Sequence, residues 1–331
     1  MEQLIQGASM PLVVLMLIVG FVFLIKGADF FVEGSSSIAK KLQVPSIIIG
    51  LTIVAMGTSL PETAVSVTAS MVNNNALAVS NVIGSNIFNL MFVIGVCSIL
   101  TPIAVQRETV VRDIPLSVIC ALLLAGLGIL AVGDKETYIL GHLDGVIFLV
   151  LFAGYIILMI RSALKARAEG KEVAIEGEED LKVLSYPKSI LCIVGGAIAI
   201  AIGGDLTVDT ASRIAVELGM SQTLVGLTIV SIGTSLPELV TSIVAARKNE
   251  VDMAVGNAVG SNIFNILMVL GIASAINPIG LLTENLLDIM ILVGFSLLVW
   301  AFAATKRKIT RKEGMAMVAL YLVYAIYIIL R

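Results

Sequence analysis

The sequence predicts an all-α polytopic membrane protein with ten transmembrane helices, arranged as two inverted five-helix repeats. The first observation is composition: the 331 residues are 58% hydrophobic and 14% charged, with a mean hydropathy of +1.04. A soluble globular domain is far less apolar. The second observation is a set of ten apolar stretches, each long enough to cross roughly 30 Å of hydrocarbon with about 20 residues. Because lipid offers no partner for open backbone groups, such runs are expected to be helices rather than barrel strands.

The ten predicted spans follow one another with short connections, except after the fifth. They lie near residues 11–38, 44–71, 76–100, 111–132, 141–161, 188–216, 220–246, 252–276, 284–304 and 314–330. The polar segment 162–187 carries both basic residues and an acidic cluster without hydrophobic periodicity, which is typical of a solvated linker.

The distribution of basic residues predicts the orientation. Seventeen of the 21 Lys and Arg residues fall in the loops after the odd-numbered spans, and three fall on the opposite side. By the positive-inside rule the basic side is cytoplasmic. We therefore expect a multi-pass protein of the cell membrane with a cytoplasmic linker, and with both termini and the turn at 73–75 outside.

An internal repeat relates the two halves of the chain. A shift of 176 residues lays GLTIVAMGTSLPE at 50–62 on GLTIVSIGTSLPE at 226–238, with eleven of thirteen positions identical, and GSNIFN at 84–89 on GSNIFN at 260–265. The predicted organisation is therefore a first repeat over 1–161, with its motif at about 50–90. The linker follows, and then a second repeat over 188–331, with its motif at about 226–266. Since each half has five spans, an odd number, the second half must enter the membrane from the opposite side.

Two glutamates stand inside these apolar spans. Glu62 and Glu238 each close a GTSLPE motif, where an ionised carboxylate costs at least a few kcal/mol. No span interior offers a repeated basic partner, since Lys26 has no counterpart in the second half. We therefore predict that both carboxylates bind a cation.

The residues around each glutamate favour a hard cation. Pro61 and Pro237 lack the N–H that would bond the carbonyl four residues back, so each helix should break beside its glutamate. Freed carbonyls next to a carboxylate make an all-oxygen site, which suits calcium or sodium rather than zinc or copper. A lone proline could equally mark a simple kink, but here it recurs beside a glutamate.

Polar residues four apart form stripes on helix faces in both halves. The stripes are Thr58, Glu62 and Ser66; Thr234, Glu238 and Ser242; Asn81, Ser85 and Asn89; and Asn257, Ser261 and Asn265. They could converge on an ion, or could serve as interhelical hydrogen bonds. A repeated acidic set, Asp29, Glu33, Asp205 and Asp209, could either line a cation funnel on the cytoplasmic side or cap and orient neighbouring helices.

The doubled GTSLPE and GSNIFN motifs resemble the two alpha repeats of the sodium/calcium exchanger family, within the calcium:cation antiporters. The resemblance, of a prokaryotic type, covers nearly the whole membrane portion. It implies that Glu62 and Glu238 bind calcium and sodium. It implies further ligands from Thr58, Ser59, Ser85 and Asn89, from Thr234, Ser235, Ser261 and Asn265, and from the backbone carbonyls of Ala55 and Ser231. It also implies exchange of three sodium ions per calcium, by spans one and six sliding across the other helices.

Two departures qualify the resemblance. Some members, including potassium-dependent exchangers, have aspartate where this chain has Asn265, which disfavours potassium cotransport. The linker is also too short for the calcium-sensing domains of animal exchangers.

Three other functions are alternatives to calcium/sodium exchange. A calcium/proton or other cation/proton antiporter could use the same glutamates, because protonation also neutralises a carboxylate. An intramembrane aspartyl protease using Asp29 and Asp205 would need Tyr-Asp and Gly-x-Gly-Asp motifs, which are absent. A passive channel would need ions to leave without strong binding. We therefore expect no enzyme activity and no cofactor beyond the transported calcium and sodium ions. Nor do we expect a nucleic-acid or obligate protein partner, and the lipid bilayer is the expected surrounding.

Overall fold

The computed structural model describes residues 5, 7–71, 75–130, 138–168, 183–220 and 231–330. Helical elements of the first half are α2 (Met10–Leu42), α3 (Ser46–Ile49), η1 (Gly50–Val54), α4 (Ala55–Thr58), α5 (Leu60–Met71), α6 (Asn75–Ile87), η2 (Phe88–Val93), α7 (Ile94–Leu100), η3 (Thr109–Asp113), α8 (Ile114–Leu130) and α9 (His142–Ala168). Those of the second half are α10 (Tyr186–Glu217), α12 (Ser231–Gly233), α13 (Leu236–Arg247), α14 (Val251–Phe264), η5 (Asn265–Leu270), α15 (Gly271–Ile276), α16 (Thr283–Ala304), η6 (Thr305–Arg307) and α17 (Arg311–Leu330).

Nine of the ten predicted spans match helices of the described residues. Eight are single runs long and apolar enough to cross a membrane, and the ninth is the pair Ser46–Thr58 and Leu60–Met71, bent by 49°. The seventh predicted span is described only from Ser231 onward, as α12 and α13, because 221–230 lie outside the described residues. Residues 73 and 74 of the predicted turn at 73–75 lie outside them too, and the count of ten stays a prediction. Of the predicted linker 162–187, residues 169–182 lie outside the described part, whereas 162–168 and 186–187 are helical and belong to α9 and α10.

The prediction of an all-α fold needs a small correction. Four strands of two or three residues, β1 (Ile103–Ala104), β2 (Tyr138–Leu140), β3 (Ile279–Leu281) and β4 (Lys308–Ile309), join helix ends. β1 pairs with β4 and β2 with β3, both antiparallel, so each two-stranded sheet links one half to the other. Backbone pairs this short are invisible in hydropathy, because they follow from how the helix ends meet.

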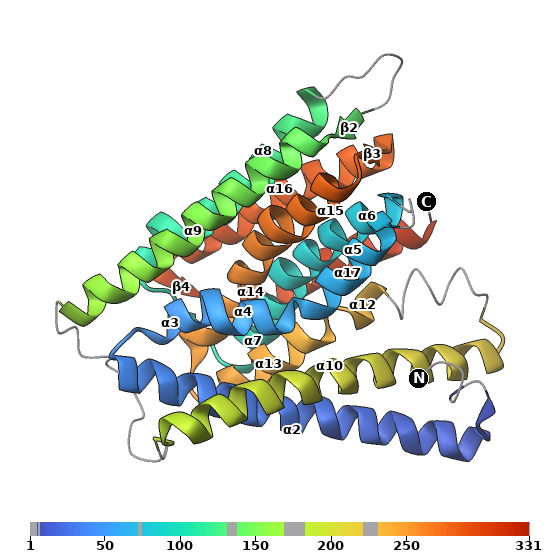
Figure 1. Ribbon diagram of the computed structural model, residues 1–331, viewed down its shortest axis with the longest axis horizontal. Helices are drawn as coiled ribbons and strands as arrows, with labels where there is room; N and C mark the ends of the chain where they lie inside the picture. Colours follow the sequence, from blue (N-terminus) through green and yellow to red (C-terminus); the bar gives the residue numbers. More distant parts are fainter. Residues whose placement is uncertain are drawn as a thin grey trace.

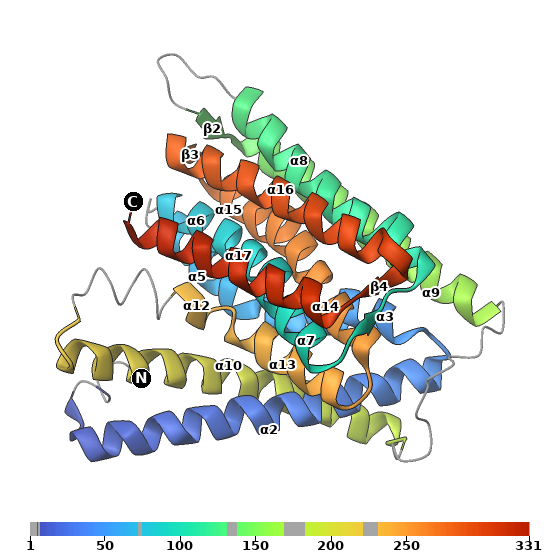
Figure 2. The same cartoon turned by 180° about the vertical axis from the view of Figure 1, so that it is seen from behind.

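Two long helices, α2 and α10, form a layer along one side of the bundle (Figures 1 and 2). Glycines spaced seven apart line their contact: Gly20, Gly27 and Gly34 on α2, and Gly196 and Gly203 on α10. A Cβ at Gly27 would lie 2.9 Å from the backbone N of Ile200, closer than real side chains pack. Small residues let the two backbones touch, as membrane helices often do, so α2 and α10 form one tightly packed unit.

The pattern of burial is the reverse of that in a soluble protein, with apolar side chains on the surface and polar side chains in the interior. Large apolar side chains such as Leu15, Ile18 and Phe21 face outward along α2, while serines, asparagines and both motif glutamates are buried. A surface of this kind is satisfied by lipid tails, and the buried polar groups must find partners within the bundle. The centre of the molecule is therefore where function is to be sought.

The halves interlock through residues 176 apart. Asn86 Nδ2 donates to the carbonyl of Asn262 at 3.2 Å, and Asn262 Nδ2 donates to the carbonyl of Asn86 at 3.1 Å. These reciprocal bonds join α6 to α14 at the middle of the bundle. Such an exchange between equivalent residues is what a two-fold relation of the halves would produce, although their inverted insertion stays a prediction.

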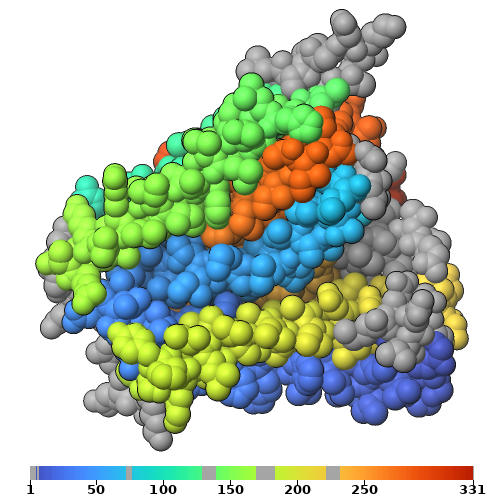
Figure 3. All heavy atoms as spheres, in the orientation of Figure 1, coloured from blue at the N-terminus to red at the C-terminus, as the bar shows by residue number. Residues whose placement is uncertain are grey.

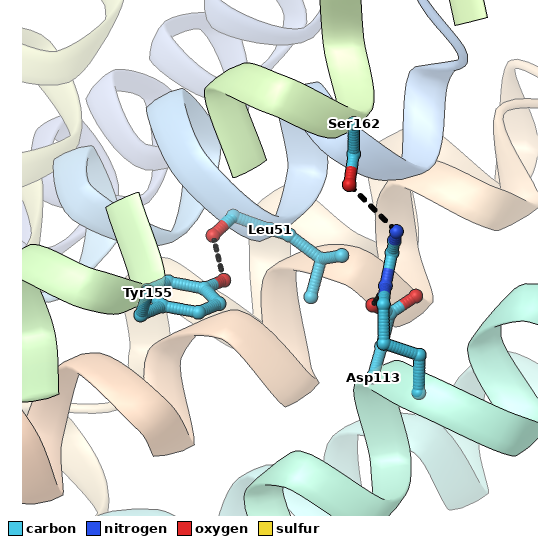
Figure 4. Close-up of polar contacts among 5 residues, drawn as sticks. Leu51, Asp113, Tyr155 and Ser162 are labelled. Carbon is cyan, nitrogen blue, oxygen red and sulfur yellow. Dashed lines mark hydrogen bonds and ion pairs between the residues drawn. The ribbon is translucent and has the colours of Figure 1, made fainter. Parts of the chain in front are cut away.

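A π-helical turn begins at or next to the last asparagine of each GSNIFN motif. η2 runs over Phe88–Val93 and η5 over Asn265–Leu270. Such turns widen a helix locally and are frequent at functional sites. Another, η1, precedes the first GTSLPE motif, and there the Tyr155 hydroxyl of α9 donates to the Leu51 carbonyl at 2.7 Å (Figure 4).

The ends of the bundle are distinct. In Figure 1 the start of α2 and the end of α17 lie at one end, whereas the end of α9 and the start of α10, which the linker joins, lie at the opposite end. We call these the terminal end and the linker end.

Candidate functional site

The two motif glutamates lie at the start of helices, as a result of the predicted breaks. α4 ends at Thr58 and α5 begins at Leu60, so Glu62 falls in the first turn of α5. In the same way Glu238 falls in the first turn of α13. The free N–H groups and dipole of a helix N-terminus favour negative charge. The broken helices thus hold each carboxylate near the partial positive charge of a helix N-terminus, which stabilises its negative charge.

Both carboxylates are completely buried, with 0% of either residue exposed. Glu62 Oε1 accepts a hydrogen bond from Ser235 at 3.2 Å, and Glu238 Oε1 accepts one from Ser59 at 3.2 Å. Each glutamate is therefore bonded by a serine of the other half. Among the described residues, no Lys, Arg or His lies within ion-pair distance of either one.

The second oxygen of each carboxylate, Oε2, has no hydrogen-bond partner among the described residues. A buried carboxylate oxygen without a donor is costly, and it normally signals an ion, a proton or water as its partner. Because Glu62 and Glu238 also repel each other electrostatically, a cation between them would remove both penalties at once.

Hydroxyl groups of both halves surround these carboxylates. Ser235 contacts Ser85 at 2.9 Å, and Ser261 donates to Glu238 Oε1 at 3.4 Å. Thr58 lies 3.5 Å from Ser261 and 2.9 Å from the side-chain oxygen of Asn257. The second threonine, Thr234, donates to the side-chain oxygen of Asn81 at 3.2 Å. The predicted polar stripes therefore meet.

The asparagines that end the GSNIFN motifs are buried but differ in their bonding. Neither amide atom of Asn89 has a partner among the described residues, and Asn265 Oδ1 has none either. Asn265 Nδ2 donates to the side-chain oxygen of Asn86 at 3.1 Å. Both side-chain oxygens are thus free of donors, as a cation ligand requires.

The two predicted carbonyl ligands are less distinctive. The carbonyl of Ala55 accepts the Ser59 N–H at 3.0 Å and lies 3.3 Å from the Thr58 hydroxyl, so it already has donors. Ser231 is the first residue of α12, and its side chain falls outside the described set.

A crevice of about 730 Å³ leads toward this centre from the terminal end. Residues of α5, of the start of α6, of α10 and of the second broken helix line it, including Pro61, Thr234, Pro237, Asp205 and Asp209. Figure 3 shows the face on which α5 (blue) and α10 (yellow) approach each other. The crevice connects the outside of the bundle with both motif prolines.

The repeated acidic set divides between two environments. Asp205 and Asp209 line the crevice, as a cation funnel would require. Asp29, the counterpart of Asp205, instead forms ion pairs with Lys26 at 3.6 Å and with Lys248 at 3.4 Å. Asp205 and Asp209 thus suit a funnel, but one at the terminal end, which is predicted to be outside, and not on the cytoplasmic side as expected. Helix orientation suits Asp29.

Asn86 and Asn262 are additions from the structure, whereas the sequence predicts Asn81 and Asn257 only as members of the polar stripes. Asn86 and Asn262 form the central exchange between halves, and Asn81 and Asn257 contact the motif threonines. The available signal was their recurrence 176 residues apart as amides in apolar spans. Within the described residues no three His, Cys, Asp or Glu side chains gather as a metal site. Beside the two glutamates, the oxygens that the described residues offer come from hydroxyls and amides.

Two buried carboxylates inside a shell of neutral oxygens, at the centre of a helical bundle with an apolar surface, define a membrane transporter of cations. The chain matches the family described as sodium/calcium exchanger protein over residues 12–161 and 188–330, and it belongs to that family. Since this is a family of exchangers, the chain is a cation antiporter and not an enzyme.

Individual relatives cover nearly the whole chain. It is 39% identical over 313 residues to the putative antiporter CaxA of Alkalimonas amylolytica, covering 93% of this chain and 95% of the relative. It is 31% identical over 342 residues to the sodium/calcium exchanger MaX1 of Methanosarcina acetivorans, covering 94% and 97%. A solved structure of the sodium-calcium exchanger NCX_Mj soaked with 10 mM Na⁺ and zero Ca²⁺ matches with a TM-score of 0.80 and 34% identity, over 95% of this chain and 98% of that one.

Proposed function

We propose that this protein exchanges calcium for sodium across the cell membrane by alternating access, with the ions held between Glu62 and Glu238. One observation carries the proposal: two fully buried carboxylates, one from each half, are bonded through one oxygen by serines of the opposite half while the other oxygen has no donor. One calcium ion or several sodium ions would neutralise this pair.

The surrounding oxygens support a metal ion as one of the charges that neutralise the glutamates. A proton needs one carboxylate oxygen and no further ligand, whereas calcium takes about six to eight oxygens. Besides the carboxylates, the site offers the hydroxyls of Thr58, Thr234, Ser59, Ser235, Ser85 and Ser261 and the amide oxygens of Asn89 and Asn265. We assign these residues, with the carbonyls of Ala55 and Ser231, as the ligand set. A calcium/proton antiporter would use the same shell in its calcium-bound state, so the shell supports calcium as a substrate, and ion flux under imposed gradients decides the coupling ion.

Charge neutralisation also gives a reason for obligatory exchange. With neither ion bound, two negative groups would have to pass through the closed intermediate together, at a cost of several kcal/mol per unpaired buried charge. The empty carrier therefore rarely reorients, and each calcium crossing is matched by a return with sodium. If three sodium ions balance one calcium, one net charge moves, and a potential changes the driving force by about 2.3 kcal/mol per 100 mV.

The moving part is proposed to be the α2 and α10 pair. Its glycine-lined contact makes the pair a rigid unit, and α10 lines the crevice while α2 packs against the linker end of the bundle. Sliding of this unit past the two broken helices would close the crevice and open its counterpart at the other end. In this proposal the ten spans form two inverted repeats, with the termini outside and the linker in the cytoplasm.

Calcium uptake into proteoliposomes tests the coupling ion. Liposomes loaded with sodium and diluted into sodium-free buffer should accumulate calcium, and an imposed proton gradient without sodium should not drive uptake. Uptake driven by protons alone would replace sodium by protons in the proposal. No calcium uptake under either gradient would reject calcium as the substrate.

A further inference from the structure

Asn81 and Asn257 lie outside the proposed ligand set and occupy equivalent positions, one in each half. Asn257 Nδ2 donates to the Glu238 carbonyl at 3.3 Å and to the Ser242 hydroxyl at 2.9 Å, both in its own half. Its Oδ1 accepts the Thr58 hydroxyl of the other half at 2.9 Å. All of its amide hydrogens are thereby used.

The counterpart repeats each of these bonds. Asn81 Nδ2 contacts the Glu62 carbonyl at 3.5 Å and the Ser66 hydroxyl at 3.0 Å, and its Oδ1 accepts the Thr234 hydroxyl at 3.2 Å. Each amide therefore joins the glutamate-bearing helix of its own half to the threonine of the other.

The direction of these bonds has a chemical consequence. A hydroxyl has one hydrogen and two lone pairs. Thr58 could donate that hydrogen to the carbonyls of Val54 or Ala55, at 3.2 and 3.3 Å, but Asn257 is nearer at 2.9 Å. When Asn257 takes the hydrogen, the lone pairs of Thr58 remain for a cation. Because Asn257 Nδ2 donates to both Glu238 and Ser242, the amide cannot rotate its oxygen away from Thr58.

We propose that Asn81 and Asn257 are positioning residues for ion binding. Each orients the threonine ligand of the opposite half and holds the backbone of its own glutamate, without touching the ion. The proposal rests on the calcium and sodium site proposed above and adds a crosswise coupling between its halves. Outer partners of metal ligands typically contribute 10–100-fold to metal affinity.

A double-mutant cycle on calcium affinity tests this coupling. Asn257→Leu is near-isosteric and removes every hydrogen bond of the amide, and Thr58→Val removes only the hydroxyl. We expect Asn257→Leu to weaken calcium binding 10–100-fold. Thr58→Val should also weaken calcium binding, and the fold loss it causes should be at least about threefold smaller in the Asn257→Leu background than in the wild type. The matched control pairs Asn257→Leu with Thr234→Val, which Asn257 does not contact, and there the effects should multiply.

The outcomes separate the two proposals. Independent effects of Asn257→Leu and Thr58→Val, or equal coupling in both cycles, would overturn the positioning role. Absence of calcium binding by the wild type would instead overturn the proposed function. The mirrored cycle with Asn81→Leu and Thr234→Val gives a second test of the same coupling if Asn257→Leu does not fold.

A separate observation concerns the linker end, which is more tightly packed than the terminal end in the described part of the chain and which we call the sealed end. Val208 and Thr68 line the crevice at the terminal end, whereas their repeat counterparts Val32 and Val244 are buried. Among the described residues, the crevice at the terminal end has a volume of about 730 Å³, whereas the pocket beside Val32 at the linker end has a volume of about 10 Å³.

Charged residues hold that sealed end together. Lys248, at the end of α13, donates to the Asp29 carbonyl at 2.8 Å and pairs with its carboxylate at 3.4 Å. Glu250, two residues on, accepts a hydrogen bond from Ser36 of α2. In the first half the sequence counterparts of Lys248 and Glu250 are Val72 and Asn74, which carry no charge.

The geometry points to a latch in which Lys248 and Glu250, which follow α13, bind Asp29 and Ser36 of α2. This latch stabilises the state that is open at the terminal end. Because the first-half counterparts are uncharged, the latch favours one of the two access states.

Cysteine accessibility tests the latch. In a variant lacking the native cysteines, Ala245→Cys, which is buried at the sealed end, should react several-fold faster with a water-soluble thiol reagent when Lys248→Met is added. Lys26→Met is the control, because Lys26 pairs with Asp29 from within the same helix and should leave the rate unchanged. Equal rates for the two backgrounds would overturn the latch, and so would faster labelling in both.

Discussion

Replacing either buried glutamate by glutamine separates ion binding from folding. Glu62→Gln and Glu238→Gln keep the side-chain length and an oxygen to accept the serine hydroxyl that lies at 3.2 Å. Each change removes one of two buried charges that repel each other. In the absence of ions we therefore expect both variants to unfold at a temperature no lower than the wild type.

The loss in calcium affinity follows from the charge removed. Two unit charges about 4 Å apart attract by about 4 kcal/mol at an effective dielectric constant of 20. Calcium carries twice that charge, and the lower cost of burying a neutral side chain offsets part of the difference. A net loss of at least about 4 kcal/mol corresponds to roughly 1,000-fold weaker binding.

Thermal unfolding of the purified protein measures this loss directly. Calcium at 100 times the wild-type Kd should stabilise the wild type by about 2.7 kcal/mol, and should leave the unfolding temperature of both glutamine variants unchanged. Glu284→Gln, at an exposed position, is the matched control and should keep the full calcium effect. The reasoning is refuted if either glutamine variant retains the calcium-induced rise, or if both retain sodium-driven calcium uptake.

Three further predictions concern the scaffold. Gly27→Leu should force α2 and α10 apart, because even a Cβ there would lie 2.9 Å from the backbone of Ile200. We expect this variant to lose transport, or to lose its folded peak on size-exclusion chromatography. Calcium uptake at the wild-type rate would contradict the prediction. Tyr155→Phe leaves the buried Leu51 carbonyl without its donor at 2.7 Å, so we expect about 1–3 kcal/mol of destabilisation in thermal unfolding, and a difference below about 0.5 kcal/mol would refute it. In a variant lacking the native cysteines, Glu178→Cys should react with an impermeant thiol reagent only from the cytoplasmic side, and labelling from outside intact cells would reverse the proposed orientation.

The predicted site residues could be identified from sequence because the cost of burying a charge and the breaking of a helix by proline depend on the residue itself. A carboxylate in an apolar span is costly wherever the helix lies, so Glu62 and Glu238 stand out without any structure. A proline breaks a helix through its own backbone, which is why the observed bend of 49° between α4 and α5 falls at the first motif. Repetition at a shift of 176 residues then selected the polar groups that are predicted to be functional.

Other features depend on which helices become neighbours, and they could not be predicted. Nothing local to Asn257 indicates that its oxygen accepts the hydroxyl of Thr58, 199 residues away. The short strands have the same origin, since β2 and β3 pair only where helix ends from both halves meet.

The amino-acid sequence by itself determined the membrane environment, the helical class, the duplication and the pair of acidic residues, because hydropathy, helix breaking and charge burial are properties of each segment alone. Tertiary structure decided which serine faces which glutamate, that Asp29 is paired while Asp205 lines a crevice, and that the crevice at the terminal end is much larger than the pocket at the linker end. Two halves with nearly the same motifs can differ in this way because packing depends on partners brought together from across the chain, and a repeat in sequence does not require both halves to make the same contacts at the same time.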